Sequence, residues 1–195
     1  TGLENFKSLS YLNCSNNNLT TLDCQYNQLL TNLDVSDNTN LNYLNCGDNQ
    51  LLTNLDVSNN TTLTYLNCRD NQLTTLDVST NTTLTYLNCT GNQLTSLDVR
   101  NGNNTNFITF NAISNPNLYC IDVDDPTYST VNWTNTDSWS NFSTNCFGCT
   151  DSLALNYDSL SMINDSSCNY QMTYVPDDNF ENCLESNGMG DGIAL

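Results

Sequence analysis

Tyrosine and asparagine recur together in this chain at a spacing that could place them on one binding surface. Tyr43, Tyr65 and Tyr86 each open a Tyr-Leu-Asn-Cys unit and lie 22 and 21 residues apart. The asparagines of the same units are Asn45, Asn67 and Asn88. Tyrosine rings stack on the apolar faces of sugars, and amides hydrogen-bond hydroxyl groups. These columns predict a surface for an extracellular glycan or protein, although tyrosine is also an ordinary strand residue on a plain face.

Aspartate recurs in the units that alternate with the tyrosine units. The positions are Asp34, Asp56, Asp77 and Asp98. Carboxylates stacked about 5 Å apart repel one another unless they are hydrogen-bonded, protonated or bridged by cations. Neighbouring serines such as Ser36 and Ser58 could supply the hydrogen bonds. We expect a solvated acidic face, with bridging by calcium as the alternative.

Composition argues against catalysis and against nucleic acid. The 195 residues contain no histidine, and Lys7, Arg69 and Arg100 are the only basic residues in a chain of net charge -18. The commonest general base is therefore missing, and phosphates cannot be neutralised. There is also no Ser-His-Asp set, no glycine-rich phosphate loop and no apolar run long enough to span a bilayer. We expect a protein that is not an enzyme, with no nucleic-acid partner and no membrane span.

The ten cysteines indicate an oxidising compartment. Four of them alternate with valine in the repeated units, which indicates that they are small core residues. They are Cys24, Cys46, Cys68 and Cys89. Side chains stacked on parallel strands are poorly placed for a disulfide, and a column does not converge on a metal. These four are predicted to be buried free thiols.

A repeat positions all of these columns. The unit L-x-x-L-x-[CV]-x-x-N occurs in nine consecutive matches from Leu9 to Val99. Alternation within each unit places Leu44 and Cys46 in the core and Tyr43 and Asn45 outside. Coils should stack as short parallel strands, with strands on both sides of a flattened coil or, alternatively, on one side of a horseshoe. The asparagine that closes each unit should point inward and satisfy backbone groups of the turn.

The first repeat unit is out of phase with the rest. Its cysteine, Cys14, should stack beneath Val35 instead of Cys24.

This pattern resembles leucine-rich repeats, in a nested form found in secreted surface proteins of Bacteroidetes-type bacteria. The resemblance implies a mainly β solenoid over residues 1–123, followed by a C-terminal cap over 124–147. It also implies that Cys120 pairs with Cys146 to close this cap. Trp133, Trp139 and Phe142 are then expected to cover the open end of the core.

A second resemblance covers residues 148–171. The sequence from Gly148 to Tyr170, with Gly-Cys-Thr-Asp at its start and Ser-Ser-Cys near its end, is similar to a short module common in such surface proteins. The resemblance implies a disulfide between Cys149 and Cys168, which would staple a segment too small to bury a core. Oxygen-bearing side chains in this loop could hold calcium, or could cap turns instead. They are Asp151, Asn156, Asp158 and Asp165.

Residues 172–195 resemble the N-terminal cap of a following repeat array. The resemblances together imply an extracellular or cell-surface module of a larger tandem-repeat protein, structural or adhesive in role. Its partners would be neighbouring arrays or other copies, with self-assembly into a filament as one possibility. The alternative is a glycan- or protein-binding module that uses the Tyr/Asn face.

Overall fold

The computed structural model describes residues 9–170, and the chain divides into two compact units, 1–146 and 147–195. The segment expected to begin another array, residues 172–195, lies outside the described residues. Within 9–170, no helix has the length and apolar character needed to cross a bilayer. Each unit is described on its own below.

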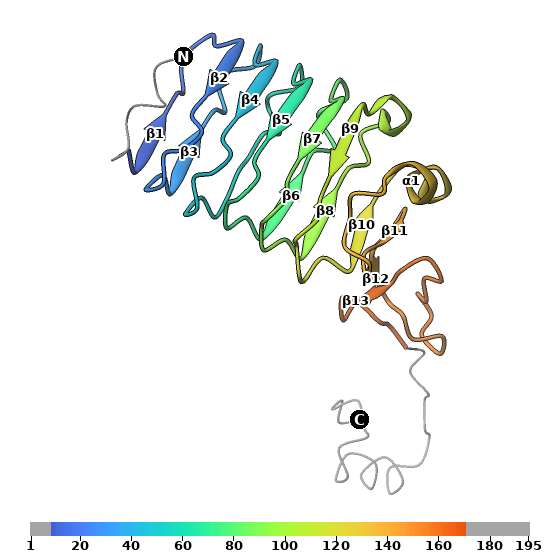
Figure 1. Ribbon diagram of the computed structural model, residues 1–195. Coiled ribbons are helices and arrows are strands. Elements are labelled where there is room, and N and C mark those ends of the chain that lie inside the picture. The colour runs from blue at the N-terminus through green and yellow to red at the C-terminus, as the bar shows by residue number, and fades with distance from the viewer. Residues whose placement is uncertain (1–8, 171–195) are drawn as a thin grey trace, which may run out of the picture. The chain divides into compact units, whose positions relative to one another are not determined.

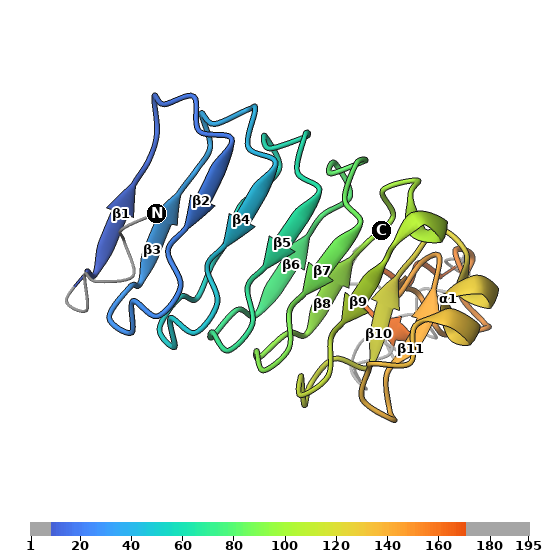
Figure 2. The same cartoon turned by 45° about the horizontal axis from the view of Figure 1, so that its top comes forward.

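The first unit is a solenoid with short parallel strands on both of its sides (Figures 1 and 2). One side is a five-stranded sheet in the order β2-β4-β5-β7-β9. Its strands are β2 (Thr21–Asp23), β4 (Tyr43–Asn45), β5 (Tyr65–Asn67), β7 (Tyr86–Asn88) and β9 (Thr109–Asn111). Tyr43, Tyr65 and Tyr86 are in register across it. The prediction of strands on both sides of the coil is confirmed.

The other side contains two sheets, β1-β3 and β6-β8-β10-β11. Their strands are β1 (Tyr11–Asn13), β3 (Asn32–Asp34), β6 (Thr75–Asp77), β8 (Ser96–Asp98), β10 (Cys120–Asp122) and β11 (Asn141–Ser143). Between the two sheets, residues 54–56 follow the same path without forming a strand. Because β1 pairs with β3, Cys14 follows the register of Val35, as its shifted position in the sequence predicts.

Leucine and small apolar residues fill the space between the two sides. Leu44, Leu66 and Leu87 from one side are fully buried, and Val35 and Val78 from the other side join them. Alternation along the strands sends the central residue, most often leucine, inward, although in β4, β5 and β10 a neighbouring residue is buried as well. The hydrophobic effect acts along the whole array because every coil covers the leucines of the next.

Buried asparagines connect the turns of successive coils. The amide nitrogen of Asn60 donates to the carbonyls of Val35 and Asn38 at 3.0 and 2.9 Å. Asn81 repeats this one coil later, with bonds to Val57 and Asn60 at 3.0 and 2.9 Å. Both side chains are completely buried. The predicted inward asparagine ladder is confirmed, and it satisfies carbonyls that the turns leave unpaired.

A short helical cap closes the far end of the solenoid. The cap contains helix α1 (Pro126–Asn132), and the 3-10 turn η2 (Asn104–Asn106) lies earlier, between β8 and β9. Asp125 caps α1 by accepting hydrogen bonds from the backbone N–H groups of Thr127 and Tyr128. Trp133 follows the helix and stacks on Phe110 with ring centroids 4.0 Å apart. Phe142 also packs on the core, but Trp139 is 45% exposed, so its expected role as a plug is wrong.

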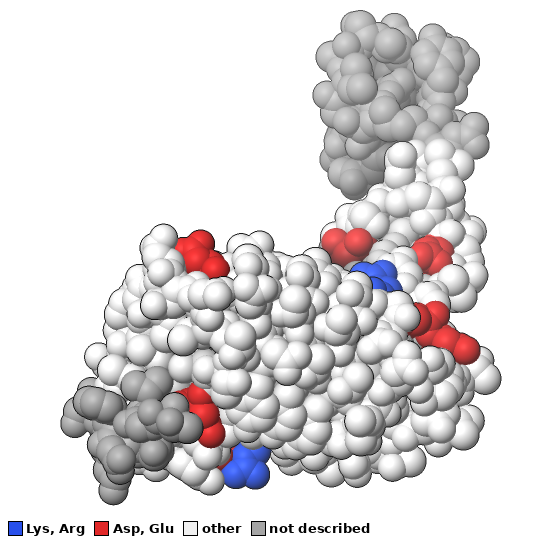
Figure 3. Space-filling view, turned by 90° about the horizontal axis from the view of Figure 1, so that it is seen from above, with Lys and Arg blue, Asp and Glu red and all other residues white. Residues whose placement is uncertain are grey.

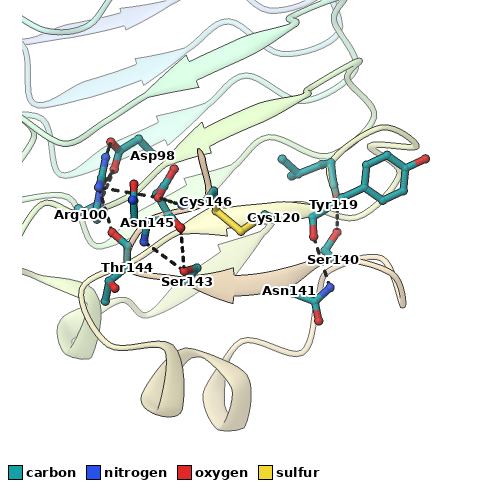
Figure 4. Close-up of a disulfide and its surroundings, with 12 residues drawn as sticks. Asp98, Arg100, Tyr119, Cys120, Ser140, Asn141, Ser143, Thr144, Asn145 and Cys146 are labelled. Atoms are coloured by element: carbon teal, nitrogen blue, oxygen red, sulfur yellow. Dashed lines mark hydrogen bonds and ion pairs between the residues drawn. A yellow bond between two sulfur atoms is a disulfide. The ribbon is translucent and has the colours of Figure 1, made fainter. Parts of the chain in front are cut away.

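A disulfide and an arginine hold the cap to the last coils (Figure 4). Cys120 of β10 bonds to Cys146, with their Cα atoms 5.7 Å apart. Beside it, the Arg100 guanidinium donates to the Asp98 carboxylate and, at 3.0 Å, to the carbonyl of Thr144. Asp122 accepts the Cys146 N–H at 2.8 Å. The disulfide implied by the resemblance is thus present, and charged hydrogen bonds surround it.

The second unit is a small stapled module. Its strands β12 (Phe147–Gly148) and β13 (Ile163–Asn164) pair in parallel. The implied disulfide between Cys149 and Cys168 is present. Within its described part, residues 147–170, Ala154 and the sulfur-bonded Cys149 are the buried apolar residues. A unit with so little core depends on its covalent staple.

Substitution of a ladder asparagine tests the coil-to-coil contact. Asn60→Ala removes two donors to buried carbonyls, so we expect the free energy of unfolding to fall by about 2 kcal/mol. Asn59→Ala is the matched control, since Asn59 is the adjacent residue and is exposed. Urea denaturation followed by circular dichroism measures both variants. Equal losses in the two variants would contradict the structural role of the ladder.

Candidate functional site

The tyrosine column forms a ridge on the five-stranded sheet. The rings of Tyr43 and Tyr65 stack with centroids 4.3 Å apart and planes 12° apart. Tyr65 and Tyr86 stack in the same way, at 4.1 Å and 13°. Parallel strands bring equivalent residues about 4.8 Å apart, which is close to the thickness of stacked rings. The three rings, here called the tyrosine ridge, are half-buried and support one another.

Ring stacking decides which part of each tyrosine a partner can reach. Both faces of Tyr65 are covered, one by Tyr43 and the other by Tyr86. Burial, together with the neighbouring phenols, raises the pKa of Tyr65, so its hydroxyl stays neutral at any physiological pH. The middle of the ridge therefore presents a ring edge and a neutral hydroxyl group. Such a surface suits a protein partner better than a sugar ring that would stack on an aromatic face, because the faces of the middle ring are covered.

The asparagines beside the ridge do not point freely into solvent as predicted. Asn45 is 5% exposed and Asn67 is 8% exposed. The Asn67 amide donates to the Asn45 oxygen at 3.1 Å, and the Asn67 oxygen accepts the Arg69 N–H at 3.3 Å. Asn88 accepts the Thr90 N–H in the same manner. These amides close the turn after each strand, so this part of the predicted Tyr/Asn surface is corrected.

The aspartate column likewise caps turns. Asp34 accepts hydrogen bonds from the backbone N–H and the hydroxyl of Ser36, at 3.1 and 2.7 Å, and these bonds lower its pKa. The pKa of Asp56 is lowered by Ser58 in the same way. Lowered values keep the carboxylates ionised and make them poor general acids. Figure 3 shows that on the face it draws, acidic side chains occur singly or in small groups on a mostly uncharged surface.

Cysteines form an inward column behind the ridge. Cys24, Cys46, Cys68 and Cys89 are fully buried and unpaired. Burial raises the pKa of Cys46 and Cys89 to about 12, and the pKa of Cys68 well above its usual value. The sulfurs of Cys68 and Cys89 lie 3.6 and 3.5 Å from carbonyls of the next coil. Neutral, inaccessible thiols are structural and not nucleophilic.

The oxygen ligands predicted for calcium cap separate turns of the second unit. Asp151 accepts the Leu153 N–H and the Tyr170 hydroxyl, Asp158 accepts the Leu160 N–H, and Asp165 accepts the Ser167 N–H. Asn156 bridges to Ser167 and Asn169. Among residues 9–170, no three side chains of Asp, Glu, Cys or His gather where they could hold a metal. Calcium binding stays a prediction, and an ion would have to displace these turn bonds.

A hollow of about 580 Å³, which was not predicted from the sequence, lies at the turns that follow strands of the five-stranded sheet. Gln28, Gln50 and Gln72 line it together with Leu29 and Leu51. The signal was visible in the sequence, since glutamine follows the closing asparagine in each of these units. These residues lie between the regularly spaced positions of the repeat unit, so the repeat pattern by itself does not predict the hollow.

Comparison with known proteins supports a leucine-rich-repeat-like solenoid. No protein-family model matches the sequence, and no curated protein matches it. Among solved structures, the functional domain of InlJ from Listeria monocytogenes, which is described as including a cysteine ladder, is similar to this chain. The two are 34% identical, with a TM-score of 0.51 over 61% of this chain. The chain spans 29% of the length of that protein chain.

The cysteine column predicts an unreactive set of thiols. At pH 8 we expect Cys46, Cys68 and Cys89 to resist iodoacetamide in the native chain and to react fully in guanidinium chloride. Burial and raised pKa values both suppress the thiolate that attacks the reagent. Peptide mass spectrometry reads each cysteine separately. Rapid modification of any of the three under native conditions would show that the column opens to solvent.

Proposed function

We propose that this chain is a non-enzymatic extracellular module of a larger tandem-repeat surface protein, with an adhesive role. The observation that carries the proposal is the tyrosine ridge, an ordered row of aromatic edges on the outer face of a rigid sheet. Tyrosine is enriched where proteins bind one another, because it offers a large contact area with few rotatable bonds. A protein partner is therefore the first candidate for this surface.

The other repeated polar side chains of the solenoid also support the proposal, because they already form hydrogen bonds that stabilise the fold. The hydroxyls of Thr62 and Thr83 donate to backbone carbonyls of the preceding coil, and those of Thr31 and Thr95 do the same. Asparagine and aspartate side chains cap turns, as described above. Groups that are engaged in this way are not available to a substrate, which favours a contact surface over an active site.

The extracellular location is supported by the two disulfides, which persist in oxidising compartments. The similarity to the functional domain of InlJ, which includes a cysteine ladder, supports a repeat module with a buried column of cysteines. The alternative role is assembly into filaments, which predicts large assemblies that grow with protein concentration.

An attachment assay tests the adhesive role. Beads coated with the chain should be retained under flow on at least one of a panel of immobilised extracellular matrix proteins. Tyr65→Ala should lower retention at least fivefold, because it removes the middle ring that supports both neighbours. Tyr119→Ala is the matched control, since Tyr119 is an exposed tyrosine outside the ridge.

Circular dichroism must show that both variants are folded. Absence of retention on every surface would overturn the adhesive role. Sedimentation velocity completes the test, since large assemblies that grow with concentration would favour the filament instead.

A further inference from the structure

The hollow at the turn edge arises from two single-residue insertions. After the closing asparagine, two coils read Gln-Leu-Leu and the next two read Gln-Leu. The last leucine of each turn is fully buried, at Leu30, Leu52, Leu73 and Leu94. The inserted residues, Leu29 and Leu51, have no place in this core column, and they are 49% and 43% exposed. Leucine is thus displayed at two adjacent coils, where it lines the hollow.

Glutamine amides surround these leucines and are free to bind. Gln28, Gln50 and Gln72 occupy the same place in successive coils and are exposed. None of the three side-chain amides forms a hydrogen bond with another group within residues 9–170. Each amide contributes two donors and an acceptor. This row contrasts with the asparagine ladder, whose amide donors are taken up by the backbone.

The charged side chains at the hollow give it a net charge. The Arg69 guanidinium donates to Asp48 at 2.9 and 3.1 Å and lies 3.7 Å from Asp70. Gly91 has a φ of +67°, and a Cβ there would collide with the Asp70 carboxylate, so glycine lets this carboxylate lie across the next coil. Two carboxylates against one guanidinium leave the hollow with a net negative charge.

We infer that this hollow is a binding site for an uncharged carbohydrate. Amides and carboxylates hydrogen-bond hydroxyl groups, and the exposed leucines offer apolar contact to the C–H groups of a sugar ring. The volume is in the range of small-ligand sites, which is roughly 300–1,000 Å³. Carboxylated or sulfated glycans are excluded by the negative charge.

This inference goes beyond the proposed adhesive function by adding a second site with its own ligand class, and it rests on that function only in treating the chain as a binder. The residues involved differ from those of the tyrosine ridge. An extended peptide is a less suitable ligand, because the hollow offers side-chain amides and not an open backbone edge for strand addition.

The test uses a printed array of oligosaccharides and the whole chain. We expect binding to at least one neutral glycan and none to the sialylated or sulfated forms of the same glycan. For the glycan that binds, calorimetric titration should show at least a tenfold weaker affinity for the double variant Gln50→Ala, Gln72→Ala. Gln93→Ala is the matched control, because Gln93 is an exposed glutamine of the same column that does not line the hollow.

A charge variant provides the second arm. Asp70→Asn keeps the size of the side chain but replaces a negatively charged acceptor by a neutral amide with both a donor and an acceptor, and it should admit acidic glycans that the wild-type chain rejects. Several outcomes overturn the inference: no glycan bound at millimolar concentration, equal binding of acidic forms, equal losses in Gln93→Ala, or capture of a peptide at the hollow instead of sugar. Loss of glycan binding with bead attachment intact would separate this site from the tyrosine ridge.

Discussion

The fold depends on how the backbone of a turn is satisfied when the turn lies against a hydrophobic core. Each coil of this solenoid bends at its corners, and the bends leave carbonyl groups facing inward where water cannot reach them. A buried asparagine at each corner donates to its own turn or to the turn before it. Leucine burial holds the coils together, but the amides determine their register, since a shifted coil would leave these carbonyls unpaired.

Most polar side chains of the solenoid already form hydrogen bonds within it, and this limits what its surface can bind. Threonine hydroxyls, aspartate carboxylates and most asparagine amides are consumed in holding coils and turns, although they are polar and regularly spaced. Repetition of a side chain on a solenoid is therefore weak evidence of a binding surface. The tyrosine ridge and the glutamine side chains at the hollow differ from these groups. The tyrosine rings stack on one another and leave their edges outside, and the glutamine side-chain amides have no hydrogen-bond partner within the described chain.

Much of this could be predicted from periodicity because a repeat of 21 or 22 residues constrains every coil equally. The inward leucines, the buried thiols, the asparagine ladder and the strands on both sides all follow from alternation and stacking. What could not be predicted depends on contacts between coils. Asn45 and Asn67 are buried and hydrogen-bonded to each other, and Trp133 packs on the aromatic cluster of the cap while Trp139 stays exposed. The separation of Asp151, Asp158 and Asp165 reflects turns whose directions no sequence pattern specified.

The bond between Cys120 and Cys146 has a mechanical consequence for a chain that continues beyond residue 146. Tension applied through the second unit enters the solenoid at Cys146 and passes directly through the sulfur atoms into β10. Residues 121–145, which include helix α1 and strand β11, form a closed loop outside the path of the force. Pulling therefore cannot peel the cap from its end, and the first noncovalent contacts to bear the strain are those of β10 with the coil beneath it.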